Sequence, residues 1–401
     1  MIRNGGRLLV ECLIGLGATR SFGVPGESYL AVLDALHDTQ GKLDYTLCRN
    51  EGGAAFMASA YGKLTGSPGI CFVTRGPGAT NASIGVHTAM QDSSPMILFV
   101  GQVGTDMKGR EAFQEIDYRS VFGTVAKWAV EIDDVARLPE IVARAWTTAL
   151  TGRPGPVVVA LPEDMLTTMT EAAPLSAPAA IFEPAPAPEA IASAFKLLAT
   201  AERPVLLMGG ANWTVGGRAA LQAFAEASDI PVVAAFRYQD QFDNHSPVFV
   251  GEAGVGMVAH VKALLREADV ILAVNVRFGE MTTDGYTLLS VPVPRQKLIH
   301  VHGSDREIGK IYVPAIGIHA GPNAFARALT PVKGGWADWR AAARKAYEGT
   351  FGAPVQPGPV DMVEVSAWLR ANLPADVILT NGAGNFTVWP NKFFKFGPDA
   401  R

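Results

Sequence analysis

The sequence has few of the features that mark secreted, membrane-spanning or nucleic-acid-binding proteins. Of its 401 residues only Cys12, Cys48 and Cys71 are cysteines, and no two form a C-x-x-C pair. We therefore expect reduced core thiols and a cytoplasmic protein. No apolar run approaches the roughly 18 residues that cross a bilayer, and a net charge of −4 without a basic run argues against nucleic acid.

Two common kinds of active site are also missing. No serine stands in a G-x-S-x-G segment, which disfavours an α/β-hydrolase. The seven histidines are scattered, and His300 and His302 alternate without a cysteine or a third histidine nearby, so we expect no metal site built from this chain's residues. With 48% hydrophobic and only 18% charged residues, the chain is typical of a globular protein.

Short apolar runs alternate with segments of helical periodicity, which is typical of a parallel sheet with helices on both faces. We predict an α/β fold with two doubly wound parallel-sheet domains plus the beginning of a third. The first domain covers residues 1–170, a Pro/Ala-rich linker 171–189 and a central domain 190–335. Residues 360–401 begin the third, incomplete domain, with a helix at Met362–Leu373 and a strand at Val377–Leu379.

Three loops of the first domain follow predicted strands, namely Pro25–Glu27, Arg49–Gly53 and Arg75–Asn81. The carboxyl ends of parallel strands share one edge of the sheet, and ligands bind at that edge. We therefore expect these three loops to lie close together and to form the ligand site.

Glu51 is the residue of these loops with the clearest chemistry. An acid in the first turn of a helix complements the helix dipole, and this structural role needs no ligand. However, Gly52 and Gly53 follow it and would let a flat ligand approach the carboxyl closely. Apolar neighbours at residues 54–56 would disfavour its charged form, and such a group suits proton sharing with a ring nitrogen.

The segment Gly76-Pro77-Gly78 precedes a predicted helix and could bind a phosphate at the helix N-terminus. It matches neither G-x-G-x-x-G nor G-x-x-x-x-G-K-[ST]. A tight turn between strand and helix accounts for it equally well.

Six segments of the chain form an ordered set. They are F-G-V-P-G at Phe22–Gly26, R-N-E-G-G-A-A-F-M-A at Arg49–Ala58, V-T-R-G-P-G-A-T-N at Val73–Asn81, S-P-M-I at Ser94–Ile97, A-F-Q-E at Ala112–Glu115 and R-P-G-P-V at Arg153–Val157. In order and spacing they resemble the acetolactate synthase-like family of thiamine-diphosphate enzymes. The resemblance identifies residues 1–170 as the family's pyrimidine-binding domain and 360–401 as the start of its diphosphate-binding domain.

The resemblance implies roles for the loop residues. Glu51 would hydrogen-bond a ring nitrogen of the cofactor's aminopyrimidine, which prepares the thiazolium carbon to attack a 2-oxo acid. The cofactor then supplies the electron sink, and the protein supplies position and electrostatics. The residues that would line the pyrimidine side are Pro25, Gly26, Pro77 and Asn81.

Further implied roles depend on a second subunit and on the third domain. Phe113 and Gln114 would lie over the reacting carbon of a partner subunit's cofactor, so the resemblance implies a homodimer or homotetramer with the active site between subunits. Gly384 and Asn385 would begin to meet the diphosphate. The family's magnesium motif, a Gly-Asp-Gly followed by an Asn, does not occur. We therefore expect these residues alone to lack the Mg²⁺ anchor and to be inactive.

The central domain departs from the flavin pattern of acetolactate synthases, which bind FAD there. Gly123 stands where those enzymes carry an Arg, residues 208–211 replace a triple glycine and residues 302–304 replace an acidic segment, whereas Arg277-Phe278 is retained. These changes argue against FAD and leave open whether flavin or a nucleotide occupies the central domain.

The function that the resemblance implies is thiamine-diphosphate-dependent decarboxylation and carboligation of a 2-oxo acid. Two alternatives stay open: a simple 2-oxo acid decarboxylase that releases an aldehyde, or a non-catalytic nucleotide-binding or assembly protein of the same fold. Glu51 favours the enzymes, because a scaffold does not require it.

Overall fold

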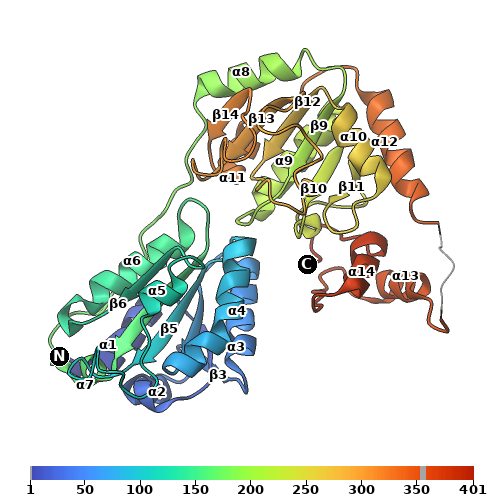
Figure 1. The fold of residues 1–401 in the computed structure, drawn as a ribbon. Helices are drawn as coiled ribbons and strands as arrows, with labels where there is room; N and C mark the ends of the chain where they lie inside the picture. Colours follow the sequence, from blue (N-terminus) through green and yellow to red (C-terminus); the bar gives the residue numbers. More distant parts are fainter. Residues whose placement is uncertain (1, 353–357) are drawn as a thin grey trace. The chain divides into compact units, whose positions relative to one another are not determined.

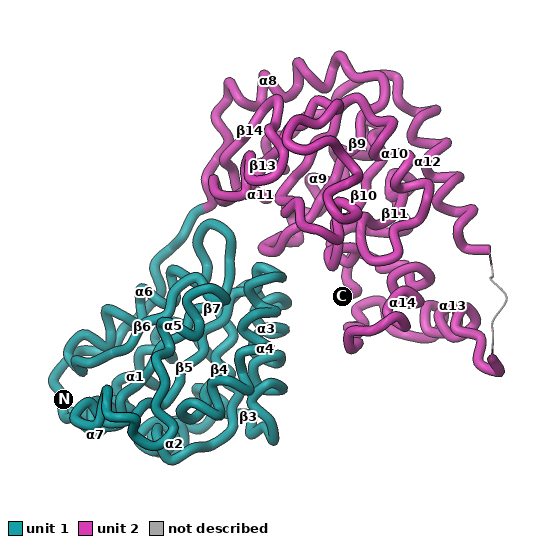
Figure 2. Tube along the Cα trace, in the orientation of Figure 1, with its two compact units in different colours: residues 1–182 teal, residues 183–401 magenta. Residues whose placement is uncertain are grey.

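The computed structural model describes residues 2–352 and 358–401 (Figure 1). The chain divides into two compact units, Met1–Phe182 and Glu183–Arg401 (Figure 2). Each unit is built around its own six-stranded sheet. The α/β class with two parallel sheets is thereby confirmed, whereas the predicted domain boundaries at 170, 189, 335 and 360 stay predictions.

The first unit alternates strands and helices from its N-terminus. Its elements are β1 (Arg3–Asn4), α1 (Gly5–Gly15), β2 (Arg20–Gly23), η1 (Glu27–Tyr29), α2 (Leu30–Asp38), β3 (Asp44–Leu47), α3 (Glu51–Thr65), β4 (Gly69–Val73), α4 (Gly76–Asp92), β5 (Met96–Gln102), α5 (Tyr118–Phe122), β6 (Trp128–Glu131), η2 (Val135–Arg137), α6 (Leu138–Leu150), β7 (Pro156–Pro162), α7 (Glu163–Thr167) and β8 (Met169–Thr170).

The sheet of the first unit has the strand order β3-β2-β4-β5-β7-β6, with every pair parallel. Strand side chains alternate between the two faces, as the pleat requires. Ile70 and Phe72 of β4 join one core cluster with α1, α2 and α6. Cys71 and Val73 join the other with α3 and α4. Burial on both faces explains why β4, β5 and β7 are continuous apolar runs.

Helices α3 and α4 pack together unusually closely because small residues line their contact. Asn50 begins α3 by accepting a hydrogen bond from Gly53 N at 3.2 Å, and Gly66 ends it in the left-handed conformation at φ 72°. On α4, a Cβ added to Gly85 would lie 2.4 Å from Ala55 Cβ. Only glycine therefore fits at position 85.

The second unit contains the remaining elements. They are α8 (Pro188–Leu198), β9 (Pro204–Met208), α9 (Val215–Ser228), β10 (Val232–Ala235), η3 (Gln239–Gln241), β11 (Phe249–Ala253), α10 (Ala259–Glu267), β12 (Val270–Val274), β13 (Lys297–His302), β14 (Ile316–His319), α11 (Pro322–Ala328), α12 (Ala337–Gly349), α13 (Met362–Asn372), η4 (Asn385–Thr387) and α14 (Val388–Phe393). The sheet order is β11-β10-β9-β12-β13-β14, again parallel throughout.

Within the second unit, residues 394–396 are held by hydrogen bonds to the backbone and side chain of Asn244 and to the side chain of Gln239. Asn244 N donates to Phe396 O at 2.8 Å, and Phe396 N donates to Asn244 Oδ1 at 3.1 Å. Gln239 Nε2 donates to Phe394 O at 3.4 Å. These bonds hold α14 close to the carboxyl end of β11.

Two predictions about local structure need correction. The strand predicted at Val377–Leu379 is wrong: this stretch is irregular, and its backbone hydrogen bonds go to Pro374 and Arg401, not to a strand. The helix predicted to start at Ala79 begins at Gly76, because Pro77 is favourable in a first helical turn, where its missing N–H costs nothing. The sequence did not predict strands β6, β11 and β14, because they are edge strands or are interrupted by polar residues.

We expect Gly85→Ala to lower the free energy of unfolding by about 1–3 kcal/mol, because the added methyl overpacks the contact with Ala55. Chemical denaturation of the 401-residue chain measures this. Gly53→Ala is the matched control, since a Cβ there meets nothing within 4 Å, and it should change stability by less than about 1 kcal/mol. Equal stabilities of the two variants would contradict the close packing.

Candidate functional site

The site lies where the chain reverses its direction across the first sheet. β3 pairs with one side of β2 and β4 with the other, which leaves a crevice at their carboxyl ends. The loops after β2 and β4 touch there: Ser28 Oγ and Thr74 Oγ1 are 2.8 Å apart. A Cβ added to Gly26 would lie 2.4 Å from Thr74 Cβ, so the approach requires bare backbone at position 26.

Glu51 is the first residue of α3 and projects at this edge of the sheet. Its Oε2 accepts a hydrogen bond of 3.0 Å from Asn81 Nδ2, which comes from the neighbouring helix α4. The carboxyl is half-buried, and Asn81 is exposed. The structure thus joins two of the predicted site residues directly, and the link depends on the close packing of α3 against α4.

Bare backbone lies beside the Glu51 carboxyl. A Cβ added to Gly78 would be 3.7 Å from Glu51 Oε1 and 3.1 Å from Thr74 Cγ2. A Cβ added to Gly52 would lie 3.2 Å from the backbone oxygen of Asn81. A carboxyl flanked by glycines on two loops is accessible to a flat heterocycle, so the residues present fit the aminopyrimidine of thiamine diphosphate.

The N-terminus of α4 is partly used by the protein itself. Gly76 N donates to Gln114 O at 3.0 Å, and Pro77, which is exposed, has no N–H to offer. A phosphate at this helix end would find these two positions unable to donate. Of the two interpretations of the Gly76-Pro77-Gly78 segment, the geometry favours the tight turn.

Arg75 is a residue that the sequence reasoning passed over, although it stands in the V-T-R-G-P-G segment. Its half-buried guanidinium donates to Glu163 Oε2 at 2.9 Å and to Phe113 O at 3.4 Å. Glu27 Oε1 lies 3.9 Å from Arg75 Nη1. Arg75 therefore ties the loops after β2 and β7 to the loop that carries Phe113 and Gln114.

The loop of residues 103–117 is held over the same edge of the sheet by Glu115. Its carboxylate accepts hydrogen bonds from Gly109 N at 2.6 Å and Ala112 N at 3.1 Å, and these bonds lower the pKa of Glu115. The Phe113 side chain is 71% exposed, and Gln114 adopts φ 66°. The turn thus presents a large apolar side chain outward, at a cost in backbone strain.

The protein behind the site is uncharged. Burial raises the pKa of the Cys71 thiol and of Tyr29, and it raises the pKa of Tyr45 to about 12. The charge of Glu51 contributes to the first two shifts. Glu51 therefore faces a neutral interior on the side away from the crevice.

Three further predicted site residues are exposed. Pro25 is exposed at the end of β2. Gly384 and Asn385 are exposed and belong to the second unit, at the start of η4. Within the described ranges 2–352 and 358–401, no group of three or more His, Cys, Asp or Glu side chains could hold a metal ion.

The sequence was compared with models of known protein families. Residues 3–121 match the N-terminal TPP binding domain of thiamine pyrophosphate enzymes, and residues 191–329 match the central domain of the same enzymes. The chain belongs to the thiamine pyrophosphate enzyme family, whose cofactor is thiamine diphosphate. The site at Glu51 lies in the TPP-binding domain.

Among individual relatives, the chain is similar to acetolactate synthase large subunits. It is 30% identical over 411 residues to that of Parasynechococcus marenigrum, covering 98% of this chain and 66% of the relative. It is 32% identical over 415 residues to that of Corynebacterium glutamicum, covering 98% and 64%. The acetolactate synthase isozyme 2 large subunit of Escherichia coli is 29% identical over 389 residues, covering 96% and 69%. The chain thus spans about two thirds of the length of these relatives.

None of the helices in residues 2–352 and 358–401 combines the length and the apolar character that crossing a membrane requires.

We expect Glu115→Gln to loosen the loop of residues 103–117. The lowered pKa means that Glu115 stabilises the loop above the unfolded carboxyl pKa of about 4.3, and that this stabilisation is lost as pH falls through the lowered value. At pH 7 the Gly109 and Ala112 amides should exchange with deuterium roughly three- to tenfold faster in the variant.

Glu111→Gln serves as the control, because Glu111 is exposed in the same loop and takes no part in these bonds. If both variants exchange like the wild type at pH 7, Glu115 does not anchor the loop.

Proposed function

We propose that the protein is a thiamine-diphosphate-dependent enzyme that decarboxylates a 2-oxo acid and condenses the product with a second carbonyl compound, as the names of its acetolactate synthase relatives suggest. The observation that carries the proposal is the Glu51 carboxyl. It stands at the crevice of a TPP-binding domain beside the bare backbone of Gly78, with Asn81 as its side-chain partner.

Glu51 holds and orients one ring nitrogen of the aminopyrimidine and exchanges a proton with it. Asn81 Nδ2 occupies one lone pair of Oε2 and restricts the rotation of the carboxyl, so Oε1 is left for the ligand. The cofactor, when bound, supplies the carbanion chemistry that decarboxylation requires. We also assign Pro25, Gly26 and Pro77 to the wall beside the pyrimidine, an assignment that rests on the family resemblance.

We assign Phe113 and Gln114 to contacts with the substrate at the cofactor of a partner subunit. Both lie on the loop that Arg75 and Glu115 hold in place, and the exposed Phe113 ring is available to a second chain. Gly384 and Asn385 are assigned to the diphosphate, and Mg²⁺ is its counter-ion. These assignments rest on the family resemblance.

A homodimer or homotetramer is supported by an apolar surface next to Glu51. Phe56 and Met57 of α3 and Ile84 of α4 are exposed by 41%, 47% and 56%. Neighbouring large apolar side chains on two packed helices are typical of a protein interface. In the proposed assembly, a second copy of the chain covers this surface. We also propose that the protein is cytoplasmic.

The central domain does not favour FAD. A Cβ added to Gly210, which adopts φ 73°, would lie 2.2 Å from Asn275 Nδ2, and Asn275 Nδ2 donates to Ala211 O at 2.9 Å. Trp213 Nε1 donates to Gly209 O at 2.8 Å. The glycine turn at the reversal point of the second sheet is thus covered by the chain's own side chains, and we propose that no flavin binds there.

A simple 2-oxo acid decarboxylase shares every feature of the Glu51 site and differs only in the fate of the product. Product analysis with pyruvate and other 2-oxo acids distinguishes it from a carboligase, because an aldehyde alone identifies the decarboxylase. A non-catalytic protein of the same fold would yield neither product.

In a version extended to the full length of the relatives, we expect Glu51→Gln to lower turnover by about 10²–10⁴, the range for a positioned proton-transfer group. Steady-state kinetics with saturating thiamine diphosphate and Mg²⁺ measure this. Circular dichroism and thermal unfolding should show an intact fold.

Glu140→Gln is the control, because Glu140 lies on the surface of α6 and pairs only with Arg137 and its own helix. Its turnover should equal that of the wild type. Unchanged turnover in Glu51→Gln would remove Glu51 from the mechanism.

We expect Ile84→Glu and Met57→Glu to raise the dissociation constant of the dimer at least roughly 100-fold, since burying an unpaired carboxylate costs about 3 kcal/mol or more. Sedimentation analysis of the 401-residue chain measures this. Val121→Glu is the control, because Val121 of α5 is exposed by 43% and lies outside this surface. A wild-type chain that is monomeric at every concentration would contradict the proposed assembly.

A further inference from the structure

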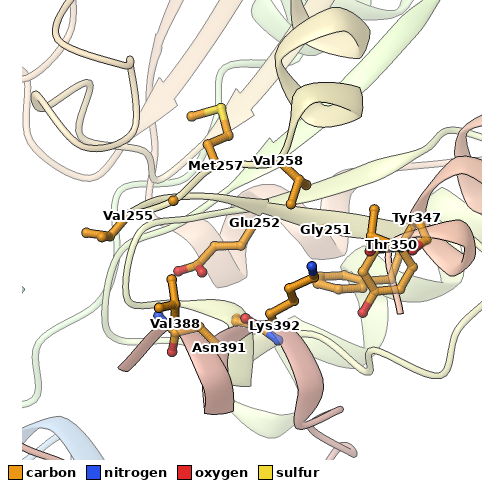
Figure 3. A pocket seen from close by; sticks show the side chains of 13 residues that line it. Gly251, Glu252, Val255, Met257, Val258, Tyr347, Thr350, Val388, Asn391 and Lys392 are labelled. Atoms are coloured by element: carbon orange, nitrogen blue, oxygen red, sulfur yellow. Dashed lines mark hydrogen bonds between the residues drawn. The ribbon is translucent and has the colours of Figure 1, made fainter. Parts of the chain in front are cut away.

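A pocket lies within the second unit, where α14 approaches the carboxyl end of β11. Its volume is about 60 Å³. Its lining comes from η3, from β11 and the loop that follows, from α12 and from α14 (Figure 3). None of the six segments that indicated the family contributes a residue to it.

Glu252 is the charged residue that enters this pocket from β11. Figure 3 shows its carboxyl extending toward the α14 side of the pocket. Oε1 accepts a hydrogen bond of 3.1 Å from Arg237 N. The described parts of the chain give Glu252 this one hydrogen bond and no ion pair. A half-buried carboxyl without a cation is costly, and it is stabilised when a cation binds.

Gln239 supplies a second acceptor. Its side chain lines the pocket and is 6% exposed, and Nε2 donates to Asn244 Oδ1 at 2.9 Å. This bond fixes the orientation of the amide, so Oε1 is the acceptor, and it is buried without a hydrogen-bond partner. Buried polar atoms in folded proteins are nearly always paired, so an unpaired carbonyl oxygen in a pocket indicates a missing donor.

The rest of the pocket is apolar and aromatic. Phe249 and Tyr347 meet edge to face with ring centroids 5.5 Å apart, and Val388 of α14 closes the opposite side. Aromatic rings attract cations as well as apolar groups. A cavity of roughly 150 Å³ accommodates benzene, so an occupant of this smaller pocket has only a few non-hydrogen atoms.

We propose that this pocket binds a small organic cation, a primary ammonium or amidinium group on a short apolar body, whose N–H groups donate to Glu252 and Gln239. The unpaired Oε1 of Gln239, a Glu252 carboxylate with one hydrogen bond and no ion pair, and apolar walls are the features that such a ligand satisfies.

Lys392 of α14 is the chain's own competitor for the pocket, because it belongs to the lining. Its Nζ lies 5.0 Å from the centroid of the Phe393 ring and makes no ion pair with Glu252. The Glu252 carboxylate is therefore not neutralised by Lys392 and can pair with an external cation.

The test is calorimetric titration of the 401-residue chain with isopropylammonium chloride at pH 8, with isopropanol as the neutral probe of the same shape. We expect a dissociation constant on the order of 1 mM for the cation, the strength available to so few atoms, and no binding of the alcohol. Glu252→Gln should weaken cation binding at least roughly tenfold.

Glu267→Gln is the matched control, because Glu267 is an exposed acid at the end of α10 and does not line the pocket. It should bind like the wild type. The proposal is overturned if the chain binds no isopropylammonium, if isopropanol binds equally well, or if Glu252→Gln binds like the wild type. Binding only by Lys392→Met would show that Lys392 fills the pocket, and this also overturns it.

The pH dependence of thermal stability and of cation affinity provides a further check on the role of Glu252. Burial raises the pKa of Glu252 to about 7; the hydrogen bond from Arg237 N opposes the shift and Asp240 of η3 adds to it. Tyr347 and Lys392 also line the pocket, and Arg344 and Lys395 lie 5.2 and 5.9 Å from the centroid of the Tyr347 ring. The native state therefore loses stability as pH rises from about 4.3, the unfolded value, to about 7. Glu252→Gln should unfold at a higher temperature than the wild type at pH 8 and at a similar temperature near pH 4, and cation affinity should rise from pH 6 to 8.

Discussion

The close packing of α3 against α4 is the constraint on which the candidate active site depends. Glycine at position 85 lets the two helices approach until Ala55 occupies the space of a side chain. Only at this separation can Asn81 on α4 donate to Glu51 at the start of α3. A proton-transfer group that is rigidly held needs less reorganisation when its ligand binds. The small residues of these helices therefore serve the geometry of the site as well as the core.

The two units share a sheet topology but differ in whether the crevice at its reversal point is open. In each sheet the strand order reverses beside the first strand of its parallel set, β2 or β9, and opens a crevice at the carboxyl ends. In the first unit glycines keep this crevice open beside Glu51. In the second unit Asn275 and Trp213 cover the equivalent glycine turn. The carboxylate of Glu252 and the unpaired side-chain oxygen of Gln239 lie elsewhere in the second unit, in the pocket beside α14.

Much of the fold was predictable because most strands of both sheets are buried on two faces. Continuous apolar runs such as Val157–Leu161 and Val270–Val274 are recognisable as buried strands, since nothing polar interrupts them. The strand predicted at Val377–Leu379 was wrong because three apolar residues acquire strand geometry only if a sheet pairs with them. Glu51 was selected as a candidate from its glycine neighbours. Arg75 was not selected, because its hydrogen bonds join loops that lie far apart in the sequence.

The sequence by itself determined the α/β class, the family and the choice of Glu51, because each depends on local pattern and on residues that are neighbours along the chain. The tertiary structure decided which partners these residues have. Asn81 meets Glu51, Gln114 covers Gly76, and Gln239 lies beside a pocket that α14 closes. These contacts join segments from different elements, and hydrogen-bond geometry and packing between elements leave no periodic trace in the order of the residues.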